Sequence, residues 1–257
     1  MTHVEINGAG ASVEAVHRAA TWNYGHFTSM QVRGGAVAGL GFHLRRLREA
    51  SAVLFPGDVP PADEAVVEFI RHALGERPDA SVRVTVLPGP DVMVSVSDPV
   101  PEDGRPPLRV RSVVYERELP ELKHVATLGL TYHQLEARRA GFDDALFVGS
   151  DGAVREGTVW NVVFWDGERV IWPEAPMLTG VTMQVLRLGL EKLGVLTEAR
   201  TVTRGALREM RAAAAANSQC PAQPIGSVDG VKLAGHAALT ELLWRAWREV
   251  AWDELGA

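Results

Sequence analysis

The stretch Val154-Arg-Glu-Gly-Thr-Val-Trp-Asn161 lies between two predicted turns, Asp151-Gly152 and Asp166-Gly167. Short apolar runs around these turns predict three strands of a meander, at residues 145–148, 159–165 and 169–172. Glu156 falls at the beginning of a strand and is followed by Gly157, where the missing side chain lets the backbone approach a flat ligand closely. The stretch therefore predicts a β-rich region with one candidate functional carboxylate.

Strands and helices alternate in the first half of the chain. The paired glycines at 34–35 accept the positive φ angles of a tight turn and predict a hairpin of residues 27–33 and 36–38. Apolar side chains at helical spacing predict helices at 42–55 and 62–74, and strands are predicted at 82–87, 92–96 and 108–115. This order predicts an α/β layer, with a domain boundary between residues 116 and 120 where the pattern changes.

Helices are also predicted in the rest of the chain. Residues 130–140 form a predicted helix that Gly141 ends, and Thr179 can cap a helix that runs to about residue 193. The alanine run at 212–216 predicts the end of an alanine-rich helix, and a terminal helix is expected from about residue 234. We therefore expect a first domain of residues 1–115 and a second of residues 121–257.

The composition excludes several classes of protein. The chain has 257 residues, a formal net charge of −6 and one cysteine, Cys220. The negative charge argues against nucleic-acid binding, and a single cysteine excludes an internal disulfide. We find no run that resembles a signal peptide, and no stretch approaches the roughly 20 apolar residues of a membrane span. We expect a cytoplasmic protein with no nucleic-acid or membrane partner.

Lys123 is a candidate nucleophile because the chain has only three lysines among its 26 basic residues. A lysine amine can lose its proton and form a Schiff base, which an arginine guanidinium cannot do. Lys192 lies in the last turn of a predicted helix, where a cation is favourable, and Lys232 follows a turn. No cap or turn accounts for Lys123, and the alternative explanation is a solvated surface lysine.

A pyridoxal-phosphate enzyme needs an amine for the aldehyde, an anion at the pyridine nitrogen and a cradle for the phosphate. Lys123 and Glu156 can meet the first two needs, because a carboxylate beside the ring nitrogen keeps it protonated. The stretch Leu178-Thr-Gly-Val-Thr182 places a glycine at a helix start, where the free amides of its last two residues would hold an anion. Arg46 offers a planar fork for the phosphate. Each residue alone has a structural alternative, as a solvated side chain or an ordinary helix cap.

Seven pieces of the chain occur in a characteristic order. They are His43-Leu-Arg-Arg-Leu47, Leu122-Lys-His124, Gly141-Phe-Asp-Asp-Ala-Leu146, Gly152-Ala-Val-Arg-Glu-Gly-Thr-Val-Trp-Asn-Val-Val-Phe164, Leu178-Thr-Gly-Val-Thr182, Ala216-Asn-Ser-Gln-Cys220 and Pro224-Ile-Gly-Ser-Val-Asp-Gly230. Their order and spacing closely resemble the class IV aminotransferases, the fold-type IV pyridoxal-phosphate enzymes. The resemblance covers nearly the whole chain, and the ordered set is specific although no single piece is.

The resemblance implies a fold and a set of roles. Lys123 would be the Schiff-base lysine and proton shuttle, and Glu156 the partner of the pyridine nitrogen. The phosphate would be bound by the following groups: Arg46, the amides of Val181 and Thr182, and Ser218. The implied fold is a two-domain α/β (α+β) subunit, with an N-terminal α/β layer domain and a C-terminal barrel-like α/β domain that carries Lys123 and Glu156. The cofactor would lie in the cleft between the domains, in a homodimer whose partner closes the site.

Several positions bear on the substrate. Thr28 stands where most transaminases of the family have a glutamate, and in this respect the chain is similar to aminodeoxychorismate lyase. Leu87-Pro-Gly89 replaces a Thr-Arg-Gly whose arginine is available to a substrate carboxylate, so Arg83, Arg33 or Arg111 would have to take that role; Arg83 could equally be a solvated strand residue. The candidate pocket residues are Tyr24, His26, Thr28 and Trp160, and the aromatic ones could equally be core side chains.

Three functions remain open at this stage. The first is a pyridoxal-phosphate-dependent aminotransferase that acts on a small amino acid or amine donor and an oxo acceptor through Lys123. The second is a lyase of the aminodeoxychorismate type that releases pyruvate, and the third is a catalytically silent binding protein of the same fold. We favour the first. A metal hydrolase is not expected, because His124, His133 and Glu136 lack the His-Glu-x-x-His spacing.

Overall fold

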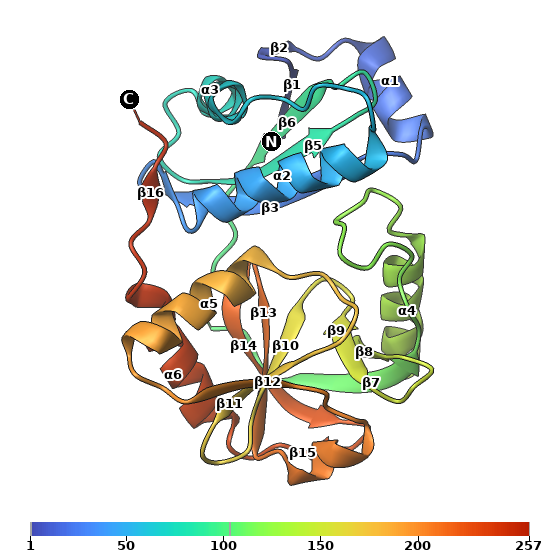
Figure 1. The fold of residues 1–257 in the computed structure, drawn as a ribbon, viewed down its shortest axis with the longest axis vertical. Helices are drawn as coiled ribbons and strands as arrows, with labels where there is room; N and C mark the ends of the chain where they lie inside the picture. The colour runs from blue at the N-terminus through green and yellow to red at the C-terminus, as the bar shows by residue number, and fades with distance from the viewer. Residues whose placement is uncertain (1, 103, 257) are drawn as a thin grey trace. The chain divides into compact units, whose positions relative to one another are not determined.

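The computed structural model describes residues 2–102 and 104–256 of the chain. The chain folds into two compact units (Figure 1). The first unit comprises Met1–Val100, Leu122–Ala126 and Trp252–Ala257. The second comprises Pro101–Glu121 and Thr127–Ala251.

The first unit contains a seven-stranded sheet in which all neighbouring strands are antiparallel. The strand order is β16-β4-β3-β5-β6-β1-β2. The strands are β1 (His3–Ile6), β2 (Ala9–Gly10), β3 (His26–Arg33), β4 (Ala36–Val37), β5 (Ala80–Val86), β6 (Val92–Ser97) and β16 (Asp253–Glu254). The helices are α1 (Val13–Thr21), α2 (Leu40–Leu54) and α3 (Asp63–Leu74).

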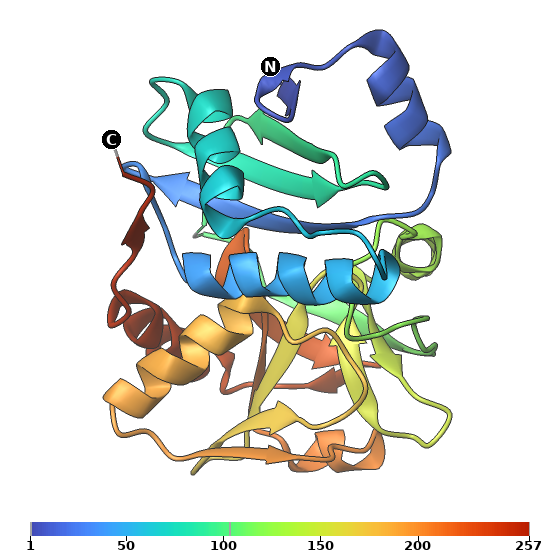
Figure 2. The same ribbon diagram turned by 45° about the horizontal axis from the view of Figure 1, so that its top comes forward.

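The sequence signals explain the core of this unit. The β3–β4 hairpin forms as predicted, with φ angles of 55° at Gly34 and 77° at Gly35, which side-chain-bearing residues rarely adopt. One apolar cluster joins the sheet to α2 and α3 (Figure 2). It includes Val84 on β5, Leu47 on α2 and Ile70 on α3, all of which are buried. The predicted α/β layer is therefore present.

The second unit contains a nine-stranded sheet of mixed direction. The order is β12-β11-β10-β13-β14-β7-β8-β9, and β15 also pairs with β14. The strands are β7 (Leu108–Val114), β8 (Asp144–Val148), β9 (Val154–Gly157), β10 (Asn161–Trp165), β11 (Val170–Pro173), β12 (Thr197–Arg200), β13 (Ala212–Asn217), β14 (Cys220–Val228) and β15 (Val231–Lys232). The helices are α4 (Leu128–Arg139), α5 (Val181–Lys192) and α6 (His236–Arg248), with a 3-10 turn at Gly205–Glu209.

This sheet curls around its own core. Side chains from β7, β8, β9, β10, β11, β13 and β14 all belong to one apolar cluster, which includes Val110, Leu146, Phe164 and Ile225. A flat sheet of this width could not bring the inner faces of so many strands into one cluster. The barrel-like second half is therefore confirmed, and α5 and α6 cover the outer face of its central strands.

The prediction of an alanine-rich helix ending near residue 216 was wrong, because Ala212–Asn217 is the strand β13. The side chains of successive alanines point to opposite faces of this strand. Ala213 and Ala215 face the interior cluster, whereas Ala212, Ala214 and Ala216 pack in the cluster formed with α5 and α6. All five are at most 3% exposed. Burial on both faces of a central strand overrides the weak helix preference of alanine.

The division of the chain differs from the predicted boundary between residues 116 and 120. β7 was expected in the first domain, but it pairs in parallel with β8 and β14 of the second sheet. Lys123 was expected in the second domain, but the segment Leu122–Ala126 belongs to the first unit. Both β7 and the Lys123 segment are assigned to their units by backbone pairing with strands far away in the sequence. Local sequence patterns do not predict such pairing.

Gly189 offers a test of the helix packing in the second unit. A Cβ atom on Gly189 would lie 1.9 Å from the carbonyl oxygen of Ala246, so α5 and α6 must separate to admit it. We expect Gly189→Ala to lower the free energy of unfolding by roughly 1–3 kcal/mol, measured by urea denaturation. Gly41→Ala is the control, because Gly41 is helical, exposed and has open space around it. A stability equal to the wild type in Gly189→Ala would contradict the close packing.

Candidate active site

Lys123 is anchored to the first unit by its backbone. The carbonyl oxygen of Lys123 accepts a hydrogen bond of 2.9 Å from the Phe27 amide, and the Val125 amide donates to the Gly25 carbonyl at 3.0 Å. His26 and His124 form a β-bridge between these contacts. The lysine segment thus lies along the beginning of β3. This pairing holds Lys123 in place, although the chain before Leu122 and after Ala126 belongs to the second unit.

Two cations lie against the ring of Phe27. The Nζ atom of Lys123 is 4.9 Å from the ring centroid, and the guanidinium carbon of Arg83 is 3.6 Å from it. The face of an aromatic ring attracts cations at these distances. Arg83 extends from β5, which pairs with β3, and its Nε atom donates to the Thr85 hydroxyl at 3.4 Å. Phe27 therefore gathers Lys123 and Arg83 at one place on the sheet.

Thr28 on β3 and His43 and Arg46 on α2 form a hydrogen-bonded chain. The Thr28 hydroxyl lies 2.5 Å from Nδ1 of His43 and accepts a longer bond of 3.5 Å from Nη1 of Arg46. Thr28 and His43 are both buried. Burial holds the pKa of His43 well below its usual value, and the charges of Arg46 and Lys123 lower this pKa further. The site around neutral His43 is therefore cationic, which suits an anionic ligand.

Tyr24 and His26 contact the end of α2. The Tyr24 hydroxyl donates to the Leu54 carbonyl at 2.8 Å, and Nε2 of His26 lies 2.9 Å from the Ser51 hydroxyl. His26 is fully buried, and burial lowers its pKa to about 4. Thr28 is also fully buried, and both residues bond to side chains of α2. Their role as pocket residues stays a prediction.

Glu156 lies on β9 and forms a buried ion pair. Its Oε1 atom accepts a hydrogen bond of 3.0 Å from Nη1 of Arg117, and the two side chains are only 8% and 6% exposed. Arg117 follows β7 in the chain and was not predicted as a site residue. An opposite charge at this distance favours the ionised carboxylate. Glu156 is therefore an oriented anion, as the partner of a protonated ring nitrogen must be.

Asn161 organises the predicted phosphate cradle. Its side-chain amide donates to the Leu178 carbonyl at 2.7 Å, which fixes the loop before α5. A Cβ atom on Gly180 would lie 2.0 Å from Oδ1 of Asn161, so this position requires glycine. Val181 and Thr182 open α5, and no side chain caps the helix at Gly180. Their amides remain available to an anion at the positive end of the helix dipole.

Ser218 lies at the same end of the sheet as this cradle. Asn161 pairs with Ala216 on β13, two residues before Ser218. The turn that carries Ser218 is fixed by Asn217, whose Oδ1 accepts bonds from the Gln219 and Cys220 amides at 2.9 and 3.0 Å. Asn161 thus connects both predicted phosphate-binding pieces of the second unit.

The comparisons with known proteins agree with this arrangement. The family model for amino-transferase class IV matches residues 25–228, which is most of the chain. This chain belongs to the class IV aminotransferase family. A comparison with curated proteins finds no match.

Solved structures share the fold over nearly the whole chain. The branched-chain amino acid aminotransferase of Escherichia coli has a TM-score of 0.82 at 17% identity and covers 99% of both chains. A putative 4-amino-4-deoxychorismate lyase of Legionella pneumophila has a TM-score of 0.78 at 18% identity, with 90% of this chain and 93% of that chain covered. A fold IV-transaminase of Curtobacterium pusillum has a TM-score of 0.74 at 26% identity, with 88% of each chain covered.

Class IV aminotransferases depend on pyridoxal phosphate, and the residues of this chain fit that group. The uncapped amides at the start of α5 and the cationic site around Arg46 suit a phosphate. The buried anion Glu156 suits a protonated pyridine nitrogen. Among residues 2–102 and 104–256, no group of acidic, histidine or cysteine side chains could hold a metal ion, and no helix is long and apolar enough to cross a membrane.

Trp160 packs inside the second unit. Its indole Nε1 donates to Asp144 at 3.1 Å, and a Cβ atom on Gly157 would lie 2.0 Å from the indole ring. Gly157 was expected to admit a flat ligand, but its Cβ direction is occupied by Trp160. The indole is 5% exposed and belongs to the interior cluster of the curled sheet. Its role as a pocket residue stays a prediction.

Four residues of the site were not predicted, namely Phe27, His43, Arg117 and Asn161. His43 lies three residues before Arg46, so helical spacing could have placed both side chains on one face. Asn161 is a polar residue inside the apolar run at 159–165, and a buried amide needs a hydrogen-bond partner. Nothing in the sequence pattern connects Arg117 to Glu156, because the two lie 39 residues apart on different elements.

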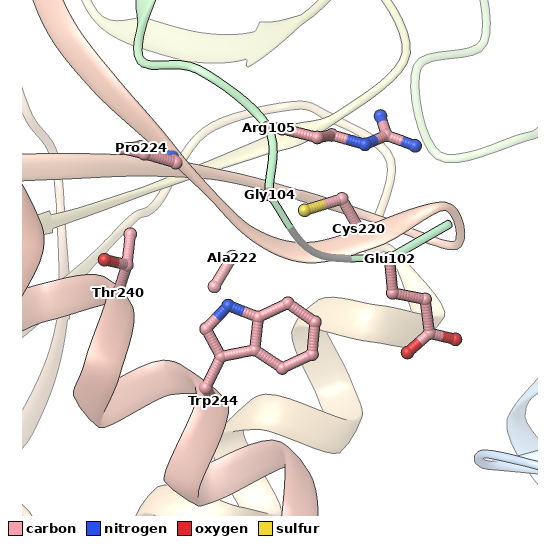
Figure 3. Close-up of a pocket in the computed structure, with 8 residues that line it drawn as sticks. All are labelled: Glu102, Gly104, Arg105, Cys220, Ala222, Pro224, Thr240 and Trp244. Atoms are coloured by element: carbon pink, nitrogen blue, oxygen red, sulfur yellow. The ribbon is translucent and has the colours of Figure 1, made fainter. Parts of the chain in front are cut away.

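A separate pocket of about 180 Å³ lies in the second unit and is lined by none of the predicted site residues (Figure 3). Its lining residues are Glu102, Gly104, Arg105, Cys220, Ala222, Pro224, Thr240 and Trp244. Arg105 donates to the Gln219 carbonyl at 3.3 Å, next to the turn that carries Ser218. This contact holds Arg105 against the β13–β14 turn.

The buried histidine His26 predicts a loss of stability in acid. Its pKa is about 4 in the fold against 6.5 when exposed, so the unfolded chain binds the proton first as the pH falls below 6.5. The stabilisation by neutral His26 is complete above pH 6.5 and is lost as the pH falls toward 4. Between pH 7 and pH 5, we expect His26→Gln to lose roughly 2 kcal/mol less unfolding free energy than the wild type.

Urea denaturation at the two pH values measures this difference. His17→Gln is the control, because His17 is exposed on α1. Equal losses in the wild type and in His26→Gln would show that His26 is not neutral in the fold.

Proposed function

We propose that this protein is a pyridoxal-phosphate-dependent aminotransferase in which Lys123 binds the cofactor's aldehyde carbon. The bound cofactor supplies an electron-withdrawing ring that makes the substrate's α-hydrogen acidic. Lys123 then moves a proton between the substrate α-carbon and the C4′ atom of the cofactor. The observation that carries the proposal is the anchoring of Lys123 on β3, with its amine against the Phe27 ring. The charge of Lys123 also lowers the pKa of His43.

The remaining predicted site residues would bind and orient the cofactor. Glu156, held by Arg117, would accept a hydrogen bond from the protonated ring nitrogen. Arg46 and the amides of Val181 and Thr182 would bind the phosphate, with the Ser218 hydroxyl as a further donor. The buried ion pair with Arg117 supports the role of Glu156, and the uncapped start of α5 supports the role of the Val181 and Thr182 amides.

We further propose that Arg83 binds the carboxylate of the substrate, which would be an amino acid and its oxo acid. The Arg83 guanidinium contacts the same phenyl ring as the Lys123 amine. Among the described residues it has no carboxylate partner, and it contacts the Phe27 ring and the Thr85 hydroxyl. A guanidinium fork held on a ring and without an acidic partner is suited to a carboxylate.

We also propose a homodimer in the cytoplasm. α1 has no buried side chain in the single chain, and its apolar residues Val13 and Val16 are 88% and 42% exposed. Trp22, just after the helix, is 58% exposed. Apolar side chains gathered in this way are typical of a surface that a partner covers. The single cysteine fits a reducing compartment.

The three lysines allow a direct test of the nucleophile. With pyridoxal phosphate, the wild type should acquire the visible absorbance of a lysine-bound aldehyde, and borohydride should fix the cofactor on Lys123. We expect Lys123→Ala to lose this absorbance and at least 1,000-fold of its activity. Lys192→Arg and Lys232→Arg should behave as the wild type. Full absorbance in Lys123→Ala, or borohydride labelling elsewhere, would contradict the proposal.

The same preparation separates the aminotransferase from the lyase. A panel of L- and D-amino acids should convert the aldehyde form to pyridoxamine phosphate in an aminotransferase. If no donor does so and aminodeoxychorismate yields pyruvate, the lyase is the correct assignment. If no lysine-bound form appears, the protein is a silent member of the fold.

The role of Arg83 predicts a change in substrate binding. We expect Arg83→Gln to raise KM for amino acids about 10- to 100-fold, because one charge-assisted pair is lost, while an amine without a carboxylate keeps its KM. Steady-state kinetics with both donors measure this difference. Arg111→Gln is the control, because Arg111 is exposed on β7. An equal rise in KM for both donors would show that Arg83 does not bind the carboxylate.

A further inference from the structure

Arg117 is buried to a degree that few arginines reach. Its side chain is 6% exposed, and Nη1 donates to Glu156 at 3.0 Å and to the Pro120 carbonyl at 3.5 Å. Burying two charges costs more free energy than a pair usually returns, so an apolar pair of similar size would often be at least as stable. A buried ion pair at a candidate active site therefore calls for an explanation beyond stability.

A second ion pair, between Glu116 and Arg155, joins the same two segments. Arg155 precedes Glu156 on β9, and it pairs with Glu116 at 3.3 Å and with Asp151 at 3.1 Å. These two carboxylates are 50% and 57% exposed, so this pair is partly solvated. Glu116 precedes Arg117, so Glu116–Arg155 already ties the segment to β9. The Arg117–Glu156 pair is not required for that attachment.

The position of Arg117 has an electrostatic consequence for Glu156. Arg117 bonds to Oε1, and a carboxylate offers about four lone-pair sites, so Glu156 can accept from more than one donor. A proton shared between a carboxylate and a pyridine nitrogen can lie on either group. Because Coulomb attraction falls with distance, a guanidinium bonded to the carboxylate stabilises the anion more than it repels a cation bound beyond it. Arg117 therefore biases the proton toward the nitrogen.

We propose that Arg117 is a positioning residue that keeps Glu156 an oriented anion and thereby keeps the ring nitrogen of bound pyridoxal phosphate protonated. This inference rests on the proposed function, because it assumes that Glu156 faces that nitrogen. It assigns to Arg117 control of the electron-withdrawing power of the ring, without contact between Arg117 and the substrate.

The test measures the ring proton directly. Wild type, Arg117→Gln and Glu116→Gln are loaded with pyridoxal phosphate labelled with ¹⁵N in the ring, and the nitrogen chemical shift is followed from pH 6 to 10 by NMR. We expect the nitrogen of Arg117→Gln to lose its proton at a pH at least about one unit lower than the wild type, a tenfold change in proton affinity. Glu116→Gln is the matched control for an ion pair of the same segment and should titrate as the wild type.

Further variants separate this role from a structural one. Arg117→Lys restores the cation, so it should recover most of the wild-type titration, which a purely structural role would not predict. If Arg117→Gln does not fold, Arg117→Ala is refolded with ethylguanidinium as the probe cation and loaded with cofactor. Dialysis of the probe should then lower the titration midpoint by the same unit. A midpoint that stays at the wild-type value in the folded variant without its cation overturns the inference.

The outcomes also separate this inference from the proposed function. If the wild type forms no bond between cofactor and Lys123, the proposed function fails. If the wild type forms that bond and the ring nitrogen titrates alike in wild type and Arg117→Gln, only the role of Arg117 fails.

Discussion

Two ion pairs of opposite polarity join residues 116–117 to β9, and one of them holds the Glu156 carboxylate. Glu116 pairs with Arg155, and Arg117 pairs with Glu156. Consecutive residues of a strand point to opposite faces, so each pair occupies its own face of β9. A shift of this segment by one residue would bring like charges together. The order of the charges therefore favours the observed register, and Arg117 holds the Glu156 carboxylate.

Close packing fixes the predicted phosphate cradle at the start of α5. Asn161 contacts Gly180 so closely that no side chain fits there, and its amide holds the Leu178 carbonyl. The same residue pairs with the strand that leads to Ser218. Trp160, one residue earlier, occupies the space beside Gly157. Trp160 and Asn161 thus pack against Gly157, the neighbour of Glu156, and against Gly180 at the helix start.

The sequence reveals more of this molecule through ordered motifs than through local patterns. The turn glycines and apolar spacing predicted the β3–β4 hairpin, α2 and α3, and the motif order predicted the family. The strand Ala212–Asn217 could not be predicted, because the two packed faces that favour it come from other elements. Arg117 could not be predicted either, since a surface arginine and a buried one have the same local pattern. Lys123 was identified because lysine is rare in this chain. The unit to which it belongs was not predicted, because the backbone partner of its segment is β3, which lies far away in the sequence.

The segment that carries Lys123 belongs to the first unit although residues of the second unit precede and follow it. Its partner strand, β3, comes earlier in the chain, so the lysine can be anchored as soon as residue 125 has left the ribosome. Glu156, α5 and the turn with Ser218 are synthesised later. During translation the partner strand of the lysine segment is thus available before α5 and the turn with Ser218 can fold, so the segment can be anchored while the second unit is incomplete.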